Sequence, residues 1–192
     1  ENFKSPYLSV NIQDFWNRWH ISLSTWLKDY VYIPLGGSRK GKVKTYLNLL
    51  ITFLVSGIWH GGNLTFLVWG LLHGIYQVIY RLYKKCCKVR MPKILGLMIT
   101  FLAVSCAWVF FRADNVMQAL RMFRYMFYDM DLMLAYRKFG MVKKDLFMLV
   151  AAISVLFGFD IANRKVDVLR QMDRLAIPIR YTIYLIFSIV IL

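Results

Sequence analysis

Acidic residues are scarce in this chain. Only 10 Asp and Glu accompany 25 Lys and Arg among its 192 residues, so the formal net charge is +15. Charged residues make up 18% of the chain and apolar types 59%, whereas soluble domains run near 45–50% apolar. Three cysteines are too few for a disulfide framework. This composition excludes a disordered chain and argues against an ordinary soluble domain.

An apolar chain with a strong basic charge is typical of a membrane protein that meets anionic lipid at its surface. Nucleic acid is a poorer partner, because most of the chain could not be exposed to water. The first residue is Glu1, no secretory signal pattern follows it, and the chain ends within the apolar run 184–192. We therefore expect a piece of a longer protein.

The stretch 45–80 contains no Asp, Glu, Lys or Arg. One straight helix over it would be about 54 Å long, against a hydrocarbon core of about 30 Å. The turn signal Gly-Gly-Asn at 61–63 predicts a break. The two halves, 45–60 and 64–80, then form a helical hairpin or re-entrant pair with His60 at its tip, within the membrane. Basic clusters at both outer ends predict that both lie in the cytoplasm.

The first segment has a different pattern. Apolar residues over 12–31 follow helical spacing, Asn11 can cap the helix, and Asp14 stands at its third position. The sequence Pro-Leu-Gly-Gly at 34–37 ends it. Three tryptophans on this amphipathic helix predict that it lies at the bilayer or dips into it.

Further apolar runs cover 94–111, 146–159 and 181–192, and 117–128 is amphipathic enough to lie flat on the membrane. If the membrane spans alternate, the stretch 112–145 lies outside the cell. Its excess of basic residues predicts the cytoplasmic side instead, so the topology of 112–145 stays open. The predicted fold class is all-α: a polytopic membrane protein with a re-entrant or amphipathic N-terminal helix and about four to five membrane-embedded helices.

Histidine is the residue type that could carry chemistry. An ionisable group inside a membrane is costly and therefore suggests function, and His60 is the strongest case. Ser56, one turn below, could orient its ring or bond back to its own helix. His73 follows 13 positions later, about 220° around a helix, so even an unbroken helix would separate the two rings. No pair has the short spacing of a zinc site, and no metal is expected.

No serine-nucleophile elbow, phosphate-binding loop or dinucleotide motif occurs. Two interpretations stay open from these residues. One is an enzyme that uses His60 as a general base, because a neutral imidazole can take a proton from an attacking hydroxyl. Asn63 or Trp59 could then hold the developing oxyanion. The other is a transporter or a non-catalytic membrane scaffold built on a broken-helix hairpin.

Several short sequence motifs, rich in aromatic residues, histidine and glycine, are spread over the first 113 residues. They are Glu1-Asn-Phe-x-x-Pro-Tyr7, Asp14-Phe-Trp-x-Arg-Trp-His20-Ile-Ser-Leu-Ser24, Trp26-Leu, Tyr32-Ile-Pro-Leu-Gly-Gly37, Asn48-Leu, Gly57-Ile-Trp-His60-Gly61, Trp69-Gly-x-x-His73-Gly74 and Trp108-Val-Phe-Phe-Arg112-Ala. Together they resemble the membrane-bound O-acyltransferase family, in the branch of bacterial alginate O-acetyltransferases and D-alanyl–teichoic acid transferases. The resemblance is dense over the motif-rich region 1–113 and thin over the C-terminal helices 114–192. It implies that 1–192 is the C-terminal part of one domain.

The resemblance implies an enzyme that moves an acyl group, acetyl or D-alanyl, from a thioester to a hydroxyl of an extracytoplasmic polysaccharide. The family's catalytic histidine corresponds to His60 and its second histidine to His20. Trp16 belongs to the tryptophan-rich helix that could line the path of the donor. The implied donor is acetyl-CoA or an acyl-carrier protein on the cytoplasmic side, with no tightly bound cofactor. The implied partners are membrane lipid and a polysaccharide or teichoic acid acceptor, and the implied location is the plasma membrane, as a multi-pass protein.

Overall fold

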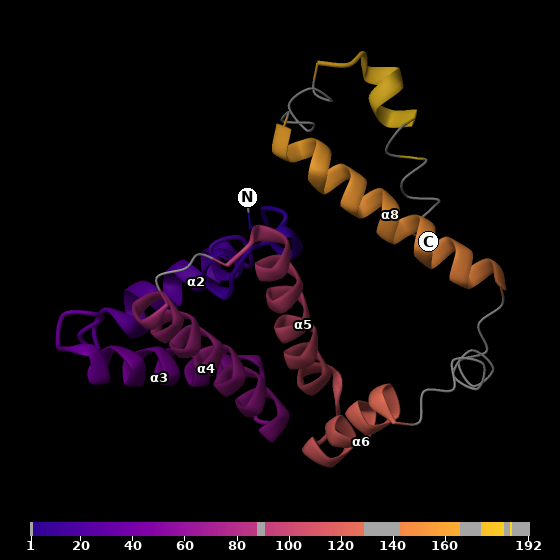
Figure 1. The fold of residues 1–192 in the computed structure, drawn as a ribbon. Coiled ribbons are helices and arrows are strands. Elements are labelled where there is room, and N and C mark those ends of the chain that lie inside the picture. The colour runs from indigo at the N-terminus through magenta and orange to yellow at the C-terminus, as the bar shows by residue number, and fades with distance from the viewer. Residues whose placement is uncertain (1, 88–90, 129–142, 166–173, 183–184, 186–192) are drawn as a thin grey trace. The chain divides into compact units, whose positions relative to one another are not determined.

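The computed structural model describes residues 2–87, 91–128, 143–165, 174–182 and 185. The regular elements of these residues are all helices (Figure 1), which confirms the all-α prediction. The chain divides into two compact units, Glu1–Asp129 and Met130–Leu192. The first unit contains the motifs quoted above, so it positions the candidate site.

The N-terminal segment is a chain of short helical pieces rather than the single helix predicted over 12–31. The pieces are η1 (Pro6–Leu8), α1 (Ile12–Trp16), α2 (Ile21–Leu27) and η2 (Lys28–Tyr32), the last a π-helical turn. The break falls at His20, whose backbone is left-handed with φ 45° and ψ 56°. Apolar spacing does not reveal such a residue, because the periodicity continues across the break.

The predicted cap of α1 is confirmed. The Asn11 side-chain oxygen accepts a hydrogen bond of 2.8 Å from the backbone N–H of Asp14. The Asp14 carboxylate in turn accepts from Nε of Arg18 at 2.7 Å and from the backbone N–H of Val10 at 3.3 Å. These bonds fix where the first turn begins and leave Asp14 with partners on both oxygens.

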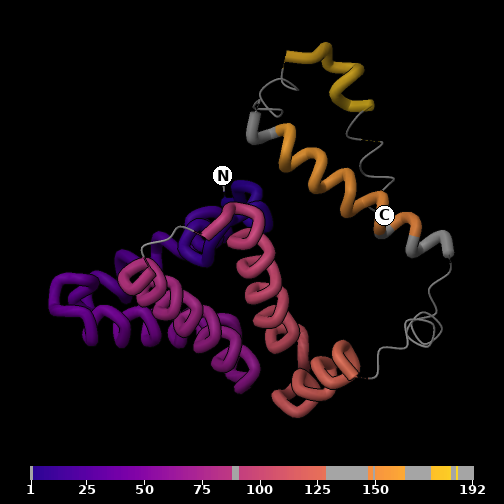
Figure 2. The backbone as a smooth tube through the Cα atoms, in the orientation of Figure 1, coloured from indigo at the N-terminus to yellow at the C-terminus, as the bar shows by residue number. Residues whose placement is uncertain are grey.

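The predicted hairpin is also confirmed as a pair of helices, α3 (Lys42–His60) and α4 (Leu64–Cys86), joined at the Gly-Gly-Asn break (Figure 2). Gly61 ends α3 with φ 154°, a backbone conformation that side-chain-bearing residues rarely adopt. At 1.5 Å per residue, α3 is about 28 Å long and α4 about 34 Å. Both are longer than the predicted halves, because each extends into its basic flank.

Glycines allow α3 and α4 to pack with their backbones in contact. A Cβ added at Gly57 would collide with the carbonyl oxygen of Phe66, and one at Gly70 would collide with that of Phe53. The close approach holds the tip of the hairpin, and His60 with it, in a fixed place against α4.

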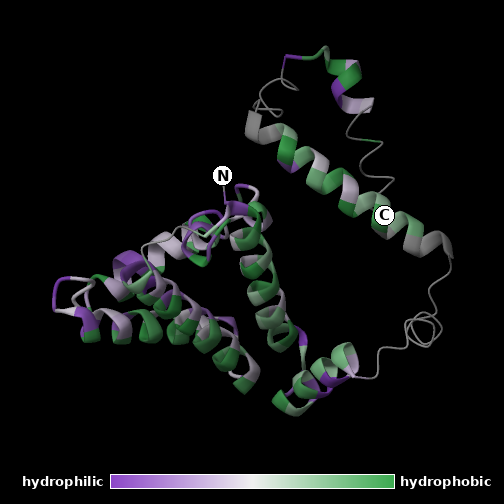
Figure 3. Cartoon of the chain, in the orientation of Figure 1, coloured by the Kyte–Doolittle hydropathy of each residue, from purple (hydrophilic) through white to green (hydrophobic). Residues whose placement is uncertain are grey.

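The helix α5 (Lys93–Arg112) covers the predicted run 94–111 and is apolar along its length (Figure 3). Within the described residues it is the one helix that is long and apolar enough to cross a membrane. The amphipathic stretch near 117–128 is confirmed as a helix, α6 (Val116–Phe127), which packs Phe123 on Phe110 with ring centroids 5.7 Å apart.

The second unit contains α8 (Lys143–Lys165), which includes the predicted run 146–159. A short helix covers 177–182. Most of the predicted run 181–192 and the stretch 129–142 lie outside the described residues.

A cluster of aromatic side chains forms the centre of the first unit. Its members come from α1, α3, α4 and α5, and the most deeply buried large ones are Trp69 and Phe15, each 1% exposed. The cluster therefore joins the N-terminal segment to the hairpin and to α5. Most of the residues that line the candidate site belong to this cluster.

Candidate active site

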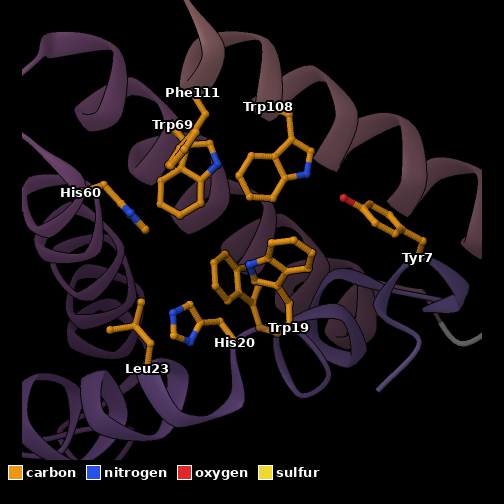
Figure 4. Close-up of a pocket in the computed structure, with 9 residues that line it drawn as sticks. Tyr7, Trp19, His20, Leu23, His60, Trp69, Trp108 and Phe111 are labelled. Carbon is orange, nitrogen blue, oxygen red and sulfur yellow. The ribbon is translucent and has the colours of Figure 1, made fainter. Parts of the chain in front are cut away.

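Two histidines from separate parts of the chain line one cavity of about 360 Å³ (Figure 4). His60 is the last residue of α3, and His20 is the residue on which α2 begins. Both rings project into the same space. The remaining walls are almost entirely aromatic, and the lining residues are Tyr7, Trp16, Trp19, His20, Leu23, His60, Trp69, Trp108 and Phe111.

Three aromatic rings hold the imidazole of His60 edge to face. The centroids of Trp59, Trp69 and Phe111 lie 4.9 Å, 5.1 Å and 5.0 Å from that of His60. Phe111 comes from the last turn of α5, so this helix supplies one wall of the His60 environment. The ring is only partly buried and keeps access to the cavity.

His20 reaches the cavity because the chain turns sharply at it. A left-handed backbone is uncommon outside glycine, although histidine is among the residues enriched there. Such outliers persist when the surrounding structure imposes them, and they cluster at functional sites. The Nδ1 atom of His20 is buried and has no hydrogen-bond partner among the described residues.

The first residues of the chain fasten the turn at His20. The backbone oxygen of Asn2 accepts from the N–H of Ile21 at 3.0 Å, and its side-chain oxygen accepts from the N–H and hydroxyl of Ser22, both at 2.9 Å. Lys4 donates its N–H to the carbonyl of Arg18 at 2.9 Å. These bonds lie on both sides of His20 and explain how its unusual backbone is maintained.

Tyr7 supplies a hydroxyl to an otherwise apolar wall. The phenol faces the indole nitrogen of Trp108 (Figure 4). Burial raises the pKa of the Tyr7 hydroxyl, so the group keeps its proton near neutral pH. Tyr7 belongs to the first quoted motif, but its position in the sequence does not predict that it lines the same cavity as the histidines.

The remaining sequence candidates lie in different places. Trp16 lines the cavity. Trp59 contacts both histidine rings, but it is 57% exposed and is not part of the lining.

Asn63 caps α4 by accepting from Thr65 N–H at 3.2 Å, and its amide donates to the carbonyl of Asp114 at 2.6 Å. Ser56 is fully buried, and its hydroxyl bonds neither to His60 nor to its own helix among the described residues.

His73 lies directly behind the cavity rather than in its wall. It is 0% exposed, and its Nδ1 accepts a hydrogen bond of 3.3 Å from the indole N–H of Trp16. Its ring also contacts Trp69 at 4.9 Å, four positions earlier on α4. His60 lines the cavity and His73 does not, and the helical spacing of the two does not predict the bond from Trp16. The four-residue spacing of Trp69 and His73 was a signal that both occupy one helix face.

The described residues contain no group of three or more His, Cys, Asp or Glu side chains that could hold a metal ion. What the cavity offers is two imidazoles, one phenol and aromatic walls. Imidazole and phenol side chains are groups that can take up and release a proton as a general base or acid does.

Residues 1–119 match the model of the membrane-bound O-acyltransferase family, MBOAT. Because this match covers more than half of the chain, the chain belongs to that family. The resemblance drawn from the short motifs is thereby confirmed, over almost the same residues.

Relatives of known name share this part of the chain. It is 52% identical over 126 residues to a peptidoglycan O-acetyltransferase of Helicobacter pylori, a match that covers 64% of this chain and 24% of the relative. It is 50% identical over 127 residues to a probable alginate O-acetylase AlgI of Pseudomonas syringae pv. tomato (66% and 24%). It is 35% identical over 115 residues to a teichoic acid D-alanyltransferase of Bacillus subtilis (53% and 29%). The chain thus spans about a quarter of the length of these curated relatives.

Proposed function

We propose that the whole protein is a membrane O-acyltransferase that esterifies a hydroxyl of an extracytoplasmic polysaccharide, with His60 as the general base. One observation carries the proposal: His60 and His20, 40 positions apart, line the same aromatic cavity (Figure 4). Membership of the family and the acyltransferase names of the relatives support it.

The proposed reaction needs only proton transfer and acyl transfer. Neutral His60 removes the proton from the attacking hydroxyl, and the oxygen forms a bond to the carbonyl carbon of the thioester. The tetrahedral intermediate collapses, the carbon–sulfur bond breaks, and the sulfur leaves. The proton held by the imidazolium then passes to that sulfur, with His20 as the second proton-transfer group. The products are an ester and a free thiol.

The proposed acyl group is acetyl rather than D-alanyl. Identity to the two O-acetylating relatives is 52% and 50%, against 35% for the D-alanyltransferase. The donor is then acetyl-CoA or an acetylated carrier, delivered from the cytoplasmic side, and the acceptor is a polysaccharide. The relatives' names differ in their acceptors, so the acceptor is proposed only at the level of its class.

We also propose a multi-pass arrangement in the plasma membrane, in which α3, α4 and α5 are membrane-embedded. The family is membrane-bound, and the lengths of α3 and α4, about 28 Å and 34 Å, are close to the hydrocarbon thickness of about 30 Å. Both helices carry large exposed apolar side chains, such as Leu47 on α3 and Ile79 on α4.

The test is mass spectrometry of surface glycans from cells that carry the full-length protein, either wild type or His60→Ala. The matched control is Ile58→Ala, because Ile58 lies on the same turn, is 60% exposed and does not line the cavity. We expect the ester mass to disappear in His60→Ala and to persist in the control, and the lost mass identifies the acyl group. Intact esters in a His60→Ala strain with normal membrane levels of the protein would instead favour a transporter or a scaffold.

A further inference from the structure

A second cavity, of about 890 Å³, lies between the C-terminal half of α4 and the N-terminal half of α5. Residues 10–12, which lead into α1, close one side of it. It shares no lining residue with the histidine cavity. Its size is within the range of small-molecule binding sites, and the proposed acyl transfer makes no use of it.

One end of this cavity is positively charged. Lys84, in the last turn of α4, and Lys93, the first residue of α5, both line it and are exposed. The ammonium group of Lys84 lies 5.8 Å from the ring centroid of Tyr80. None of the lining residues is acidic, and the nearby α1 carboxylate, Asp14, is already bonded to Arg18. An anionic group is therefore favoured at this end of the cavity.

The other end of the cavity is apolar and extends along α5. From Lys93 to Ala103 is ten residues, or about 15 Å of helix, which is half of the hydrocarbon thickness of about 30 Å. Ile79 and Ile99 line this part and are 57% and 47% exposed, so the cavity opens on the apolar outer surface. The lining residues on α5 thus extend over a length comparable to one leaflet of the hydrocarbon core.

We propose that this cavity binds one anionic phospholipid, with its phosphate between Lys84 and Lys93 and an acyl chain along Ile99 and Ala103. A small soluble anion would satisfy the lysines but leave the apolar half unfilled. A segment from elsewhere in the protein would need a carboxylate at the level of the lysines. A phospholipid supplies both the charge and the apolar length, and the cytoplasmic leaflet is rich in anionic lipids.

The test uses the full-length protein reconstituted in phosphatidylcholine nanodiscs and titrated with phosphatidylglycerol, with retained lipid measured by native mass spectrometry. The charge variants are Lys84→Gln and Lys93→Gln, alone and together. The matched control is Lys40→Gln with Lys42→Gln, which removes the same charge from exposed positions before and at the start of α3. Ala103→Phe fills the apolar end.

We expect wild type to retain phosphatidylglycerol over phosphatidylcholine, and each lysine change to weaken that retention about fivefold. The control should behave like wild type, and Ala103→Phe should lose the lipid while both lysines remain. Equal retention in the double lysine variant, or no preference for the anionic lipid, would overturn the proposal. Displacement of the lipid by inorganic phosphate or coenzyme A at millimolar concentration would also overturn it, because the site would then serve a soluble anion. Acyl transfer is not the readout, so this test can fail without affecting the proposed function.

Discussion

The indole nitrogen of Trp16 donates a hydrogen bond to Nδ1 of His73 across 3.3 Å, and this bond joins α1 to α4 inside the aromatic cluster. Because Nδ1 accepts, it carries no proton, and a neutral ring then has its proton on Nε2. Trp16 lines the histidine cavity while His73 is fully buried behind it. The bond therefore ties one residue of the cavity wall to a buried residue of α4.

Trp16→Phe removes the donor and leaves the buried Nδ1 of His73 without its partner. We expect this change to lower the free energy of unfolding by about 1–3 kcal/mol. His73→Leu removes the acceptor as well as the ring contacts. Since both changes break the same bond, the double variant should be less destabilised than the sum of the two single variants. The stabilities of wild type, the two single variants and the double variant form a double-mutant cycle, which is measured by thermal unfolding of the purified protein in detergent. If the losses of the two single variants add up to that of the double variant, the bond contributes nothing to stability.

His20→Asn and His20→Ala separate the backbone role of this residue from its chemistry. Asn tolerates a left-handed backbone, whereas for Ala it costs about 1–2 kcal/mol. We therefore expect His20→Ala to be less stable than His20→Asn by about 1 kcal/mol in equilibrium unfolding. Both should lose acyl transfer, because neither has an imidazole. Equal stability of the two variants would argue against the left-handed geometry, and an active His20→Asn would remove His20 from the mechanism.

Gly57→Ala should force α3 and α4 apart, because the new Cβ would collide with the carbonyl oxygen of Phe66. Backbone cannot move aside as a flexible side chain can, so we expect a loss of about 1–3 kcal/mol in the free energy of unfolding. Gly62→Ala is the matched control, since nothing lies within 4 Å of its Cβ position. Similar melting temperatures for the two variants would contradict the close packing of the hairpin.

Asn63→Asp and Asn63→Ala distinguish the two hydrogen bonds that Asn63 makes. Asp keeps the oxygen that caps α4 but loses the amide donor to Asp114, whereas Ala loses both. We expect Asn63→Ala to be less stable than Asn63→Asp by about 1 kcal/mol, the usual contribution of an N-terminal cap. If Asn63 also holds an oxyanion, both variants should lower the maximal rate of acyl transfer by more than their loss of folded protein explains.

The sequence was sufficient to predict the features that depend on local chemistry. The Gly-Gly-Asn break after His60, the Asn11 cap and the apolar run of α5 all follow from residue types at fixed spacing, and the structure has each of them. The resemblance to a family names His20 and His60 as two histidines of interest, but it does not predict that they line one cavity. Spacing alone gives no distance between residues on different helices.

The features that could not be predicted depend on tertiary contacts. The left-handed turn at His20 is fastened by Asn2, 18 positions earlier, and no helical pattern records such a bond. The partner of His73 lies 57 positions away on α1. Asn63 is polar and near His60 in the sequence, which suggests an oxyanion ligand, but its amide is bonded to the carbonyl of Asp114 between α5 and α6. Such pairings appear only when the chain is folded.

The most direct test of the central claim is a stoichiometric assay on the full-length protein in proteoliposomes. The donor is acetyl-CoA or an acetylated carrier, the acceptor is a soluble fragment of surface polysaccharide, and both thiol release and ester formation are measured. With wild type we expect one thiol for each ester, and with His60→Ala we expect both to fall together to background while the protein remains folded. Wild-type ester formation by His60→Ala would contradict the assignment of His60 as the base.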